Sequence, residues 1–241
     1  MVGRATPFWL AALLVAAPVV SAQDGETAPP WSGSAELGAV VTSGNSDSTT
    51  ANARGELHYR PGAWRHAARL ELLLQSEDGQ SSAERYSAAY KADRQLDEDN
   101  YLFGALRGER DRFSGFEYQV SETAGYGRRL ARWGQDGFLD AEIGAGLRQS
   151  RPEGGDFENE PIARLTLAVE HPLSASSRLT EKLQMEAGPD NVFSESVTGL
   201  RVTIKEALAL KLTQTFRHNS DVPDDRERLD SISALTLVVD F

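Results

Sequence analysis

The chain ends with Leu235-Thr236-Leu237-Val238-Val239-Asp240-Phe241, in which every second side chain is large and apolar. A period of two is typical of a β-strand, because successive side chains point to opposite faces. The odd-numbered residues of this stretch therefore share one face, and Phe241 completes it. The end of the chain is predicted to be a strand with one wholly apolar face.

The same alternation recurs along the chain from Trp31 onward. We count twelve such segments, beginning near residues 31, 49, 64, 85, 100, 118, 137, 160, 177, 191, 208 and 229. Most are about 10 to 14 residues long, whereas ordinary strands have about 5 to 6 and tilted membrane strands about 9 to 11. The sequence therefore predicts an all-β fold, a single antiparallel transmembrane β-barrel of about 12 strands. A soluble periplasmic β protein is the rival fold.

The connections between these segments alternate in length. The short ones are 60–63, 97–99, 173–176 and 205–207, and the long polar ones are 43–48, 76–84, 111–117, 151–159 and 220–228. Short turns at one end and long loops at the other are typical of outer-membrane barrels. An even number of strands then puts both termini at the short-turn end, which is predicted to be periplasmic.

The first thirty residues have the order of a secretory signal. Arg4 precedes an apolar core at 8–20, and small residues end at Ala22. A core of 13 residues interrupted by Pro18 is short for a membrane anchor helix, the alternative. We expect a signal peptide at 1–22, a flexible lead-in at 23–30 and an outer-membrane barrel at 31–241.

Composition excludes several classes of function. The chain has 241 residues with 36 acidic and 25 basic side chains, a net charge of −11 that disfavours nucleic-acid binding. It has no cysteine, so disulfides, thiolate catalysis and cysteine-ligated metals are excluded. No histidine pair has metal-ligand spacing and no glycine-rich phosphate loop is present, so we expect neither metal nor cofactor.

Aromatic residues fall at two levels of the predicted barrel. Those expected at the membrane interface on the short-turn side are Trp31, Trp64, Tyr101, Trp133 and Phe241. Amphipathic rings settle at headgroup depth, so such girdles indicate contact with lipid, including lipopolysaccharide on the outer side. A terminal phenylalanine that closes an alternating strand also resembles the signal read by the barrel-assembly machinery. We expect a monomer.

The more polar face of each segment is predicted to line the lumen. The residues expected there are Arg54, Glu56, Arg69, Glu71, Lys91, Asp140, Glu142, Arg148, Arg164, Glu170, Lys182, Glu186, Arg201, Lys211 and Arg217, with Glu36, Asp93, Arg178 and Lys205 in addition. This set has 11 basic and 8 acidic members, so the acidic excess of the chain lies mainly in the long loops.

Two interpretations of this charged lumen remain open. Opposite charges pair across a largely closed interior, or part of the set lines a narrow pore with mild anion preference. Barrels of about 8 strands have a filled interior and barrels of about 16 strands enclose a water channel. A count of twelve strands therefore does not distinguish a closed interior from a pore. We favour the closed interior. The inward face of the segments near 100 and 118 is ambiguous, so Arg107, Glu122, Arg128 and Arg129 stay unassigned.

One pair of residues has the chemistry of an esterase. If 219–228 is a loop, His218 lies opposite Leu229 and diagonal to Ser231 on the lipid side. A serine and a histidine in contact can serve as nucleophile and base on a lipid ester. This spacing is weak evidence, so we expect a protein that is not an enzyme, with a lipid-ester hydrolase as an alternative.

Several segments, taken in order, resemble one family. They are Trp31 with Gly38-Ala39-Val40-Val41-Thr42-Ser43-Gly44-Asn45-Ser46, Arg112-Phe113-Ser114-Gly115-Phe116-Glu117-Tyr118-Gln119, Gly125-Tyr126-Gly127, Glu142-Ile143-Gly144-Ala145-Gly146, and Asn219-Ser220-Asp221-Val222-Pro223 followed by Asp230 and Phe241. Together these resemble the salt-induced outer-membrane proteins of Gram-negative bacteria, a domain of unknown function. The resemblance implies a barrel and a role in envelope stress, salt or osmotic, but no catalytic or ligand residues.

Overall fold

The computed structural model describes residues 30–42, 48–78, 80–111, 116–134, 136–152, 154–222 and 227–241. The predicted signal peptide and residues 23–29 of the predicted lead-in lie outside these ranges. Within them, no helix is long and apolar enough to cross a membrane.

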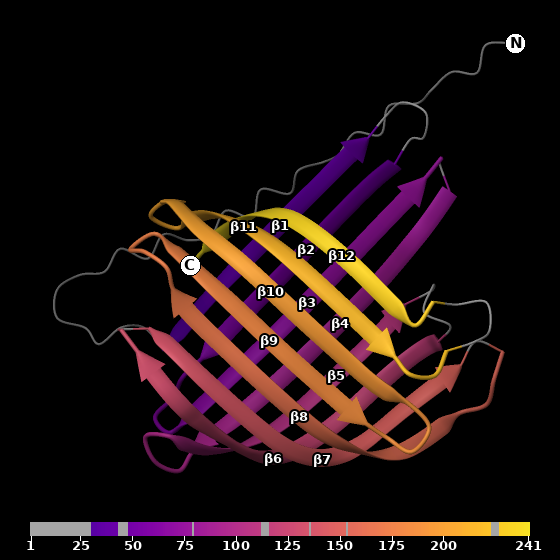
Figure 1. Ribbon diagram of the computed structural model, residues 1–241, viewed down its shortest axis with the longest axis horizontal. Helices are drawn as coiled ribbons and strands as arrows, with labels where there is room; N and C mark the ends of the chain where they lie inside the picture. The colour runs from indigo at the N-terminus through magenta and orange to yellow at the C-terminus, as the bar shows by residue number, and fades with distance from the viewer. Residues whose placement is uncertain are drawn as a thin grey trace, which may run out of the picture.

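Twelve antiparallel strands within these ranges form a closed barrel in which every strand pairs with its neighbours in the sequence and β1 pairs with β12 (Figure 1). This confirms the predicted fold. The strands are β1 (Trp31–Thr42), β2 (Ser48–Tyr59), β3 (Trp64–Glu77), β4 (Gln80–Gln95), β5 (Asn100–Asp111), β6 (Phe116–Trp133), β7 (Gly137–Pro152), β8 (Glu158–Pro172), β9 (Ser177–Ala187), β10 (Val192–Lys205), β11 (Leu208–Asn219) and β12 (Leu229–Asp240).

One expected loop is wrong. β3 continues to Glu77 and β4 begins at Gln80, so the long connection predicted over 76–84 is almost entirely strand. Small and polar residues occupy both faces of this stretch, so it carries no alternation of apolar and polar side chains. Pairing with the neighbouring strand, which periodicity does not reveal, makes it a strand.

The outer wall of the barrel is apolar. Leu37, Leu70 and Ile143 are 64%, 66% and 66% exposed, and Leu235 is 56% exposed. A continuous apolar surface of this kind is unfavourable in water and favourable against lipid. A closed barrel also satisfies its backbone hydrogen bonds internally, as a membrane span must.

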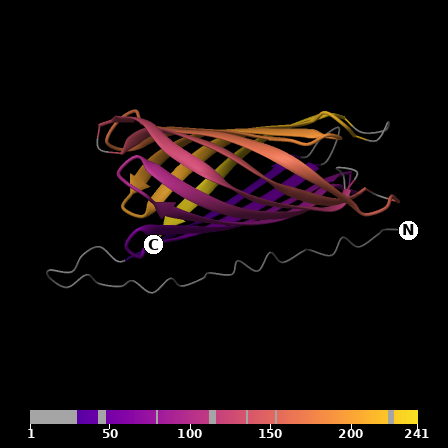
Figure 2. The same ribbon diagram turned by 90° about the horizontal axis from the view of Figure 1, so that it is seen from below.

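The seam, which is the line where β1 meets β12, is short. β1 pairs with β2 along its whole length, from Trp31↔Tyr59 to Thr42↔Ser48. Among the described residues it pairs with β12 through only four residue pairs, from Ser34↔Asp240 to Leu37↔Leu237. Beyond these pairs the two strands diverge toward the long loops (Figure 1). The C-terminus lies at the opposite end, with the short turns (Figure 2).

Candidate functional site: the interior of the barrel

Two large cavities lie in the interior. One of about 810 Å³ lies toward the short turns and includes Arg132 and Asp136 in its lining. The other, of about 590 Å³, extends along β1–β3 and β10–β12. They share His58, Arg69 and Lys182, so they adjoin. The interior is therefore hollow and polar at the short-turn end.

The structure places the fifteen residues expected in the lumen on the inner wall. Most line the two cavities, Arg148 and Glu186 line a small void of about 20 Å³, and Arg201 is paired with the cavity residue Lys211 in the β10–β11 register. Arg201 also forms an ion pair with Asp240.

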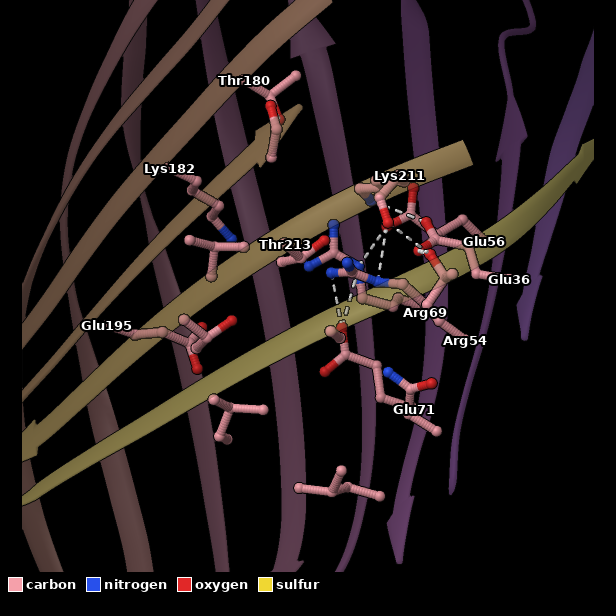
Figure 3. A pocket seen from close by; sticks show the side chains of 18 of the residues that line it. Glu36, Arg54, Glu56, Arg69, Glu71, Thr180, Lys182, Glu195, Lys211 and Thr213 are labelled. Carbon is pink, nitrogen blue, oxygen red and sulfur yellow. Dashed lines mark hydrogen bonds and ion pairs between the residues drawn. The ribbon is translucent and has the colours of Figure 1, made fainter. Parts of the chain in front are cut away.

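Ion pairs between the neighbouring strands β2 and β3 cover one wall of the 590 Å³ cavity. Arg54 Nη2 lies 2.7 Å from Glu71 Oε1, and Arg69 Nε donates to Glu56 Oε1 at 2.6 Å. Figure 3 shows these β2 and β3 side chains meeting on one wall of the 590 Å³ cavity. Register explains the contacts, because Arg54↔Glu71 and Glu56↔Arg69 are directly opposed residues.

A second group of charges crosses the interior. This cross-barrel cluster comprises Arg107 and Glu109 of β5, Glu195 of β10 and Arg217 of β11. Arg107 Nη2 lies 2.9 Å from Glu109 Oε2 and 3.2 Å from Glu195 Oε2. Arg217 forms ion pairs with the same two carboxylates, at 2.5 Å from Glu109 and 3.2 Å from Glu195. Phe193 lies 5.2 Å from each guanidinium. Since β5 and β10 are not neighbours, the cluster joins opposite walls.

The sequence did not identify most of this cluster. Arg107 was unassigned, and neither Glu109 nor Glu195 was among the expected lumen residues. Tyr101 and Phe103 explain the omission for β5, because both are buried on its inner face. Apolar residues on both faces hide the parity of a strand. The sequence offers one signal for these β5 residues: Arg107 and Glu109 continue the face of Tyr101 and Phe103 at intervals of two residues.

Tyr101 corrects one of the expected interfacial aromatics. It is 2% exposed and lies inside the barrel, where its hydroxyl donates to Glu142 Oε1 at 2.9 Å. The ammonium of Lys91 lies 2.6 Å from the same oxygen, and Arg65 lies over the ring at 4.6 Å. A buried tyrosine needs a hydrogen-bond partner, and the polar lumen supplies it.

The other four aromatics lie near strand ends at the short-turn side. Trp31, Trp64 and Phe241 are 51%, 40% and 59% exposed. Trp31 stacks on Tyr59 with ring centroids 4.0 Å apart. Trp133 is half-buried, and its ring lies 5.7 Å from that of His171.

Ser231 and His218 lie on the outer face of β12 and β11. The register places His218 opposite Leu229 and Phe216 opposite Ser231. Ser231 Oγ accepts a hydrogen bond from Gln214 Nε2 at 2.9 Å, and no bond in the described ranges joins it to His218. The same part of the chain contains no group of three acidic or histidine side chains placed to hold a metal.

Comparison with known proteins gives a family but no activity. The chain is 26% identical to the uncharacterized protein YdiY of Escherichia coli (strain K12) over 211 residues, covering 86% of this chain and 82% of the relative. Among solved structures, it is similar to the translocator domain of the autotransporter NalP from Neisseria meningitidis (TM-score 0.44, 11% identity, 88% and 86% coverage) and to the KdgM porin (TM-score 0.43, 8% identity, 88% and 98% coverage). A family model described as "Protein of unknown function, DUF481" matches residues 35–241. The chain belongs to the DUF481 family.

Proposed function

We propose that the protein is an outer-membrane barrel with a closed interior, a structural component of the envelope and not an open pore. The cross-barrel cluster carries this proposal. It links β5 to β10 and β11 by two ion pairs, Arg107–Glu195 at 3.2 Å and Arg217–Glu109 at 2.5 Å, and Arg217 is only 5% exposed. Ion pairs that span the lumen narrow it, and paired charges attract ions and water less than unpaired charges would.

The proposed orientation puts both termini in the periplasm and the long loops outside the cell. The C-terminus and the turn at 60–63 lie at one end of the barrel (Figure 2). Short turns are periplasmic in barrels of this type. Protease added to intact cells is expected to cut within 151–159 or 220–228 and to leave a tag at the C-terminus intact. Removal of the tag from intact cells would reverse the orientation.

Conductance in planar bilayers tests the closed interior. The wild-type protein is expected to give no discrete current steps. Changing both Arg107 and Arg217 to Ser removes two guanidinium groups and leaves Glu109 and Glu195 in mutual repulsion, so steps with cation preference are expected. Arg178→Ser, at an exposed pair with Glu170, is the matched control. Wild-type current steps would overturn the proposal, and a silent double variant would exclude the cluster as the closure.

An enzymatic role is not part of this proposal, because Ser231 is bonded to an amide and not to a base. Purified protein in calcium-containing buffer is expected to release no fatty acid from phospholipid. Hydrolysis that Ser231→Ala abolishes would instead establish an esterase.

The role in salt or osmotic stress stays a prediction, to be tested by the growth of a deletion strain at high salt.

A further inference from the structure

The seam is open over its half nearest the long loops. No residue of β1 beyond Leu37 pairs with β12 in the described ranges, although β1 remains a strand to Thr42 and β12 begins at Leu229. At Gly38 a Cβ atom would lie 2.7 Å from the carbonyl oxygen of Leu235. The strands therefore still touch at Gly38 and separate after it. Unpaired strand edges are costly in hydrocarbon, so this opening calls for an explanation.

A cavity lies directly behind the open part of the seam. The 590 Å³ cavity is lined by Ile232, Ala234 and Thr236 from β12 and by Asn52 and Ala53 from β2. β12 is one of the two seam strands, and β2 lies next to the other, β1, which itself contributes Glu36 to the lining. The cavity therefore lies on the inner side of the seam, and this part of its lining is largely uncharged.

The far side of the same cavity carries an unpaired cation. Lys182 of β9 lines both cavities and has no carboxylate within ion-pair distance in the described part of the chain. The charged groups that act on it include the cations Arg69, Arg107 and Arg164 as well as the carboxylate of Glu195. Figure 3 shows its ammonium group pointing into the cavity from the side opposite the wall that carries the β2 and β3 ion pairs.

A neighbouring arginine reinforces this excess of positive charge. Arg164 is 6% exposed, and among the described residues it donates only to neutral groups, to Thr123 Oγ1 at 3.0 Å, to Gln184 Oε1 at 3.1 Å and to Thr166 Oγ1 at 3.3 Å. Buried cations normally have an acidic partner. Lys182 and Arg164 lie on adjacent strands, and neither has an acidic partner among the described residues. Both line the 810 Å³ cavity, and Lys182 also lines the 590 Å³ cavity, so the region where the two cavities adjoin is suited to an anion supplied by a ligand.

We propose that the open part of the seam is a lateral portal for a single-chain amphiphile with an anionic head. The acyl chain passes through the gap between β1 and β12 and packs against Ile232 and Ala234. The phosphate or carboxylate head lies at Lys182. This proposal rests on the membrane placement given above but needs no passage through the barrel.

The head site is tested by measuring how tightly the purified protein binds dodecyl phosphate. The measurement uses native mass spectrometry in an uncharged detergent. Lys182→Met is expected to weaken binding about tenfold or more, because a charge-assisted hydrogen bond is lost. Lys182→Arg is expected to retain binding, and Lys205→Met, at an exposed strand end, is the control. Mobility of unboiled samples in SDS gels confirms that each variant is folded and keeps a folding failure distinct from a binding failure.

Two further measurements separate a portal from a site reached along the barrel axis. Inorganic phosphate at equal concentration is expected not to compete with dodecyl phosphate. Equal competition would mean that the site binds a soluble anion and would overturn the portal.

The absence of cysteine makes a cross-link at the seam specific. The variant Ala39→Cys with Leu235→Cys, bridged by a bismaleimide, is expected to slow uptake of dodecyl phosphate. The same bridge in Leu37→Cys with Leu237→Cys joins residues already paired and is expected to have no effect. Unchanged uptake in the first bridged variant would overturn the proposal.

Discussion

At the scale of single residues, glycines determine how closely β6 and β7 approach. A Cβ atom on Gly144 would lie 2.6 Å from the carbonyl oxygen of Ala124 and 2.9 Å from the ring of Phe103. Gly125 and Gly146 would bring a Cβ against the backbone of the facing strand. These positions need glycine because backbone or a buried ring occupies the space of a side chain.

Gly146→Ala is therefore expected to force β6 and β7 apart and to lower the free energy of unfolding by about 1 to 3 kcal/mol, the usual cost of overpacking. Urea unfolding in detergent micelles, followed by tryptophan fluorescence, measures this. Gly104→Ala is the control, since a Cβ atom added at Gly104 would meet nothing within 4 Å. Equal midpoints for the two variants would contradict the steric argument.

Asp97 holds the turn between β4 and β5. Its Oδ1 accepts hydrogen bonds from the Asn100 side chain at 2.8 Å and from the backbone N–H groups of Asp99 and Asn100 at 2.9 and 2.8 Å. The side-chain bond from Asn100 first, and then these backbone bonds, lower the pKa of Asp97 below its ordinary value. The stabilisation is complete above the ordinary pKa and is lost as the pH falls through the lowered one.

Asp97→Ala is expected to remove this acid-dependent part of the stability and to leave a flatter profile in the acid range. Unfolding midpoints measured between neutral pH and the acid limit of the detergent test it. Glu98→Gln, at an adjacent exposed position, should leave the profile as in the wild type. Identical profiles for wild type and Asp97→Ala would show that the turn contributes nothing.

At the scale of elements, the last residue completes the shortest strand pairing. The Gly33 N–H donates to the Phe241 carbonyl oxygen at 2.8 Å, and the Phe241 N–H donates to the Gly33 carbonyl oxygen at 3.0 Å. A Cβ on Gly33 would lie 2.6 Å from the Phe241 ring, so the ring covers that glycine. These contacts extend a pairing of only four residues.

Deletion of Phe241 is therefore expected to impair closure more than an equal truncation elsewhere. We expect a smaller fraction with folded mobility in unboiled SDS samples, both in refolding in vitro and in outer-membrane fractions. Leu173→Ala, in an exposed short turn, is the control. Normal folding in vitro with poor assembly in cells would assign Phe241 to recognition by the assembly machinery and not to closure.

At the scale of the whole molecule, charged side chains and large apolar side chains lie on opposite faces of the barrel wall. Basic and acidic side chains pair inside the barrel, and the large apolar residues lie on its outer face. Arg217→Met would remove one of the two guanidinium groups that pair with Glu109 and Glu195. Breaking a buried pair in this way typically costs about 3 to 5 kcal/mol.

The Arg217→Met variant is accordingly expected to unfold at a clearly lower urea concentration than the wild type. Arg132→Met removes a solvent-exposed partner of Asp99 and should cost about 0 to 1 kcal/mol. Equal losses in the two variants would mean that the cross-barrel cluster is hydrated and not a structural support.

Much of the fold follows from the sequence, because local alternation reports which face of a strand meets lipid. Seven strands, β1, β3, β5, β7, β9, β11 and β12, begin at the predicted residue, and the register of β11 with β12 agrees, with His218 opposite Leu229. Prediction failed where that alternation is absent. Tyr101 gave no sign of its inward position, and the polar stretch at 76–84 resembled a loop.

The sequence by itself determined that the chain forms long amphipathic strands in a closed barrel with a charged interior. Only the tertiary structure decided which charges meet across that interior, as Arg107 and Glu195 do, and which lack a partner among the described residues, as Lys182 does. It also decided that β1 leaves β12 after four pairs. Periodicity is a property of one strand, whereas closure, register and cross-barrel contacts depend on how twelve strands tilt and stagger together.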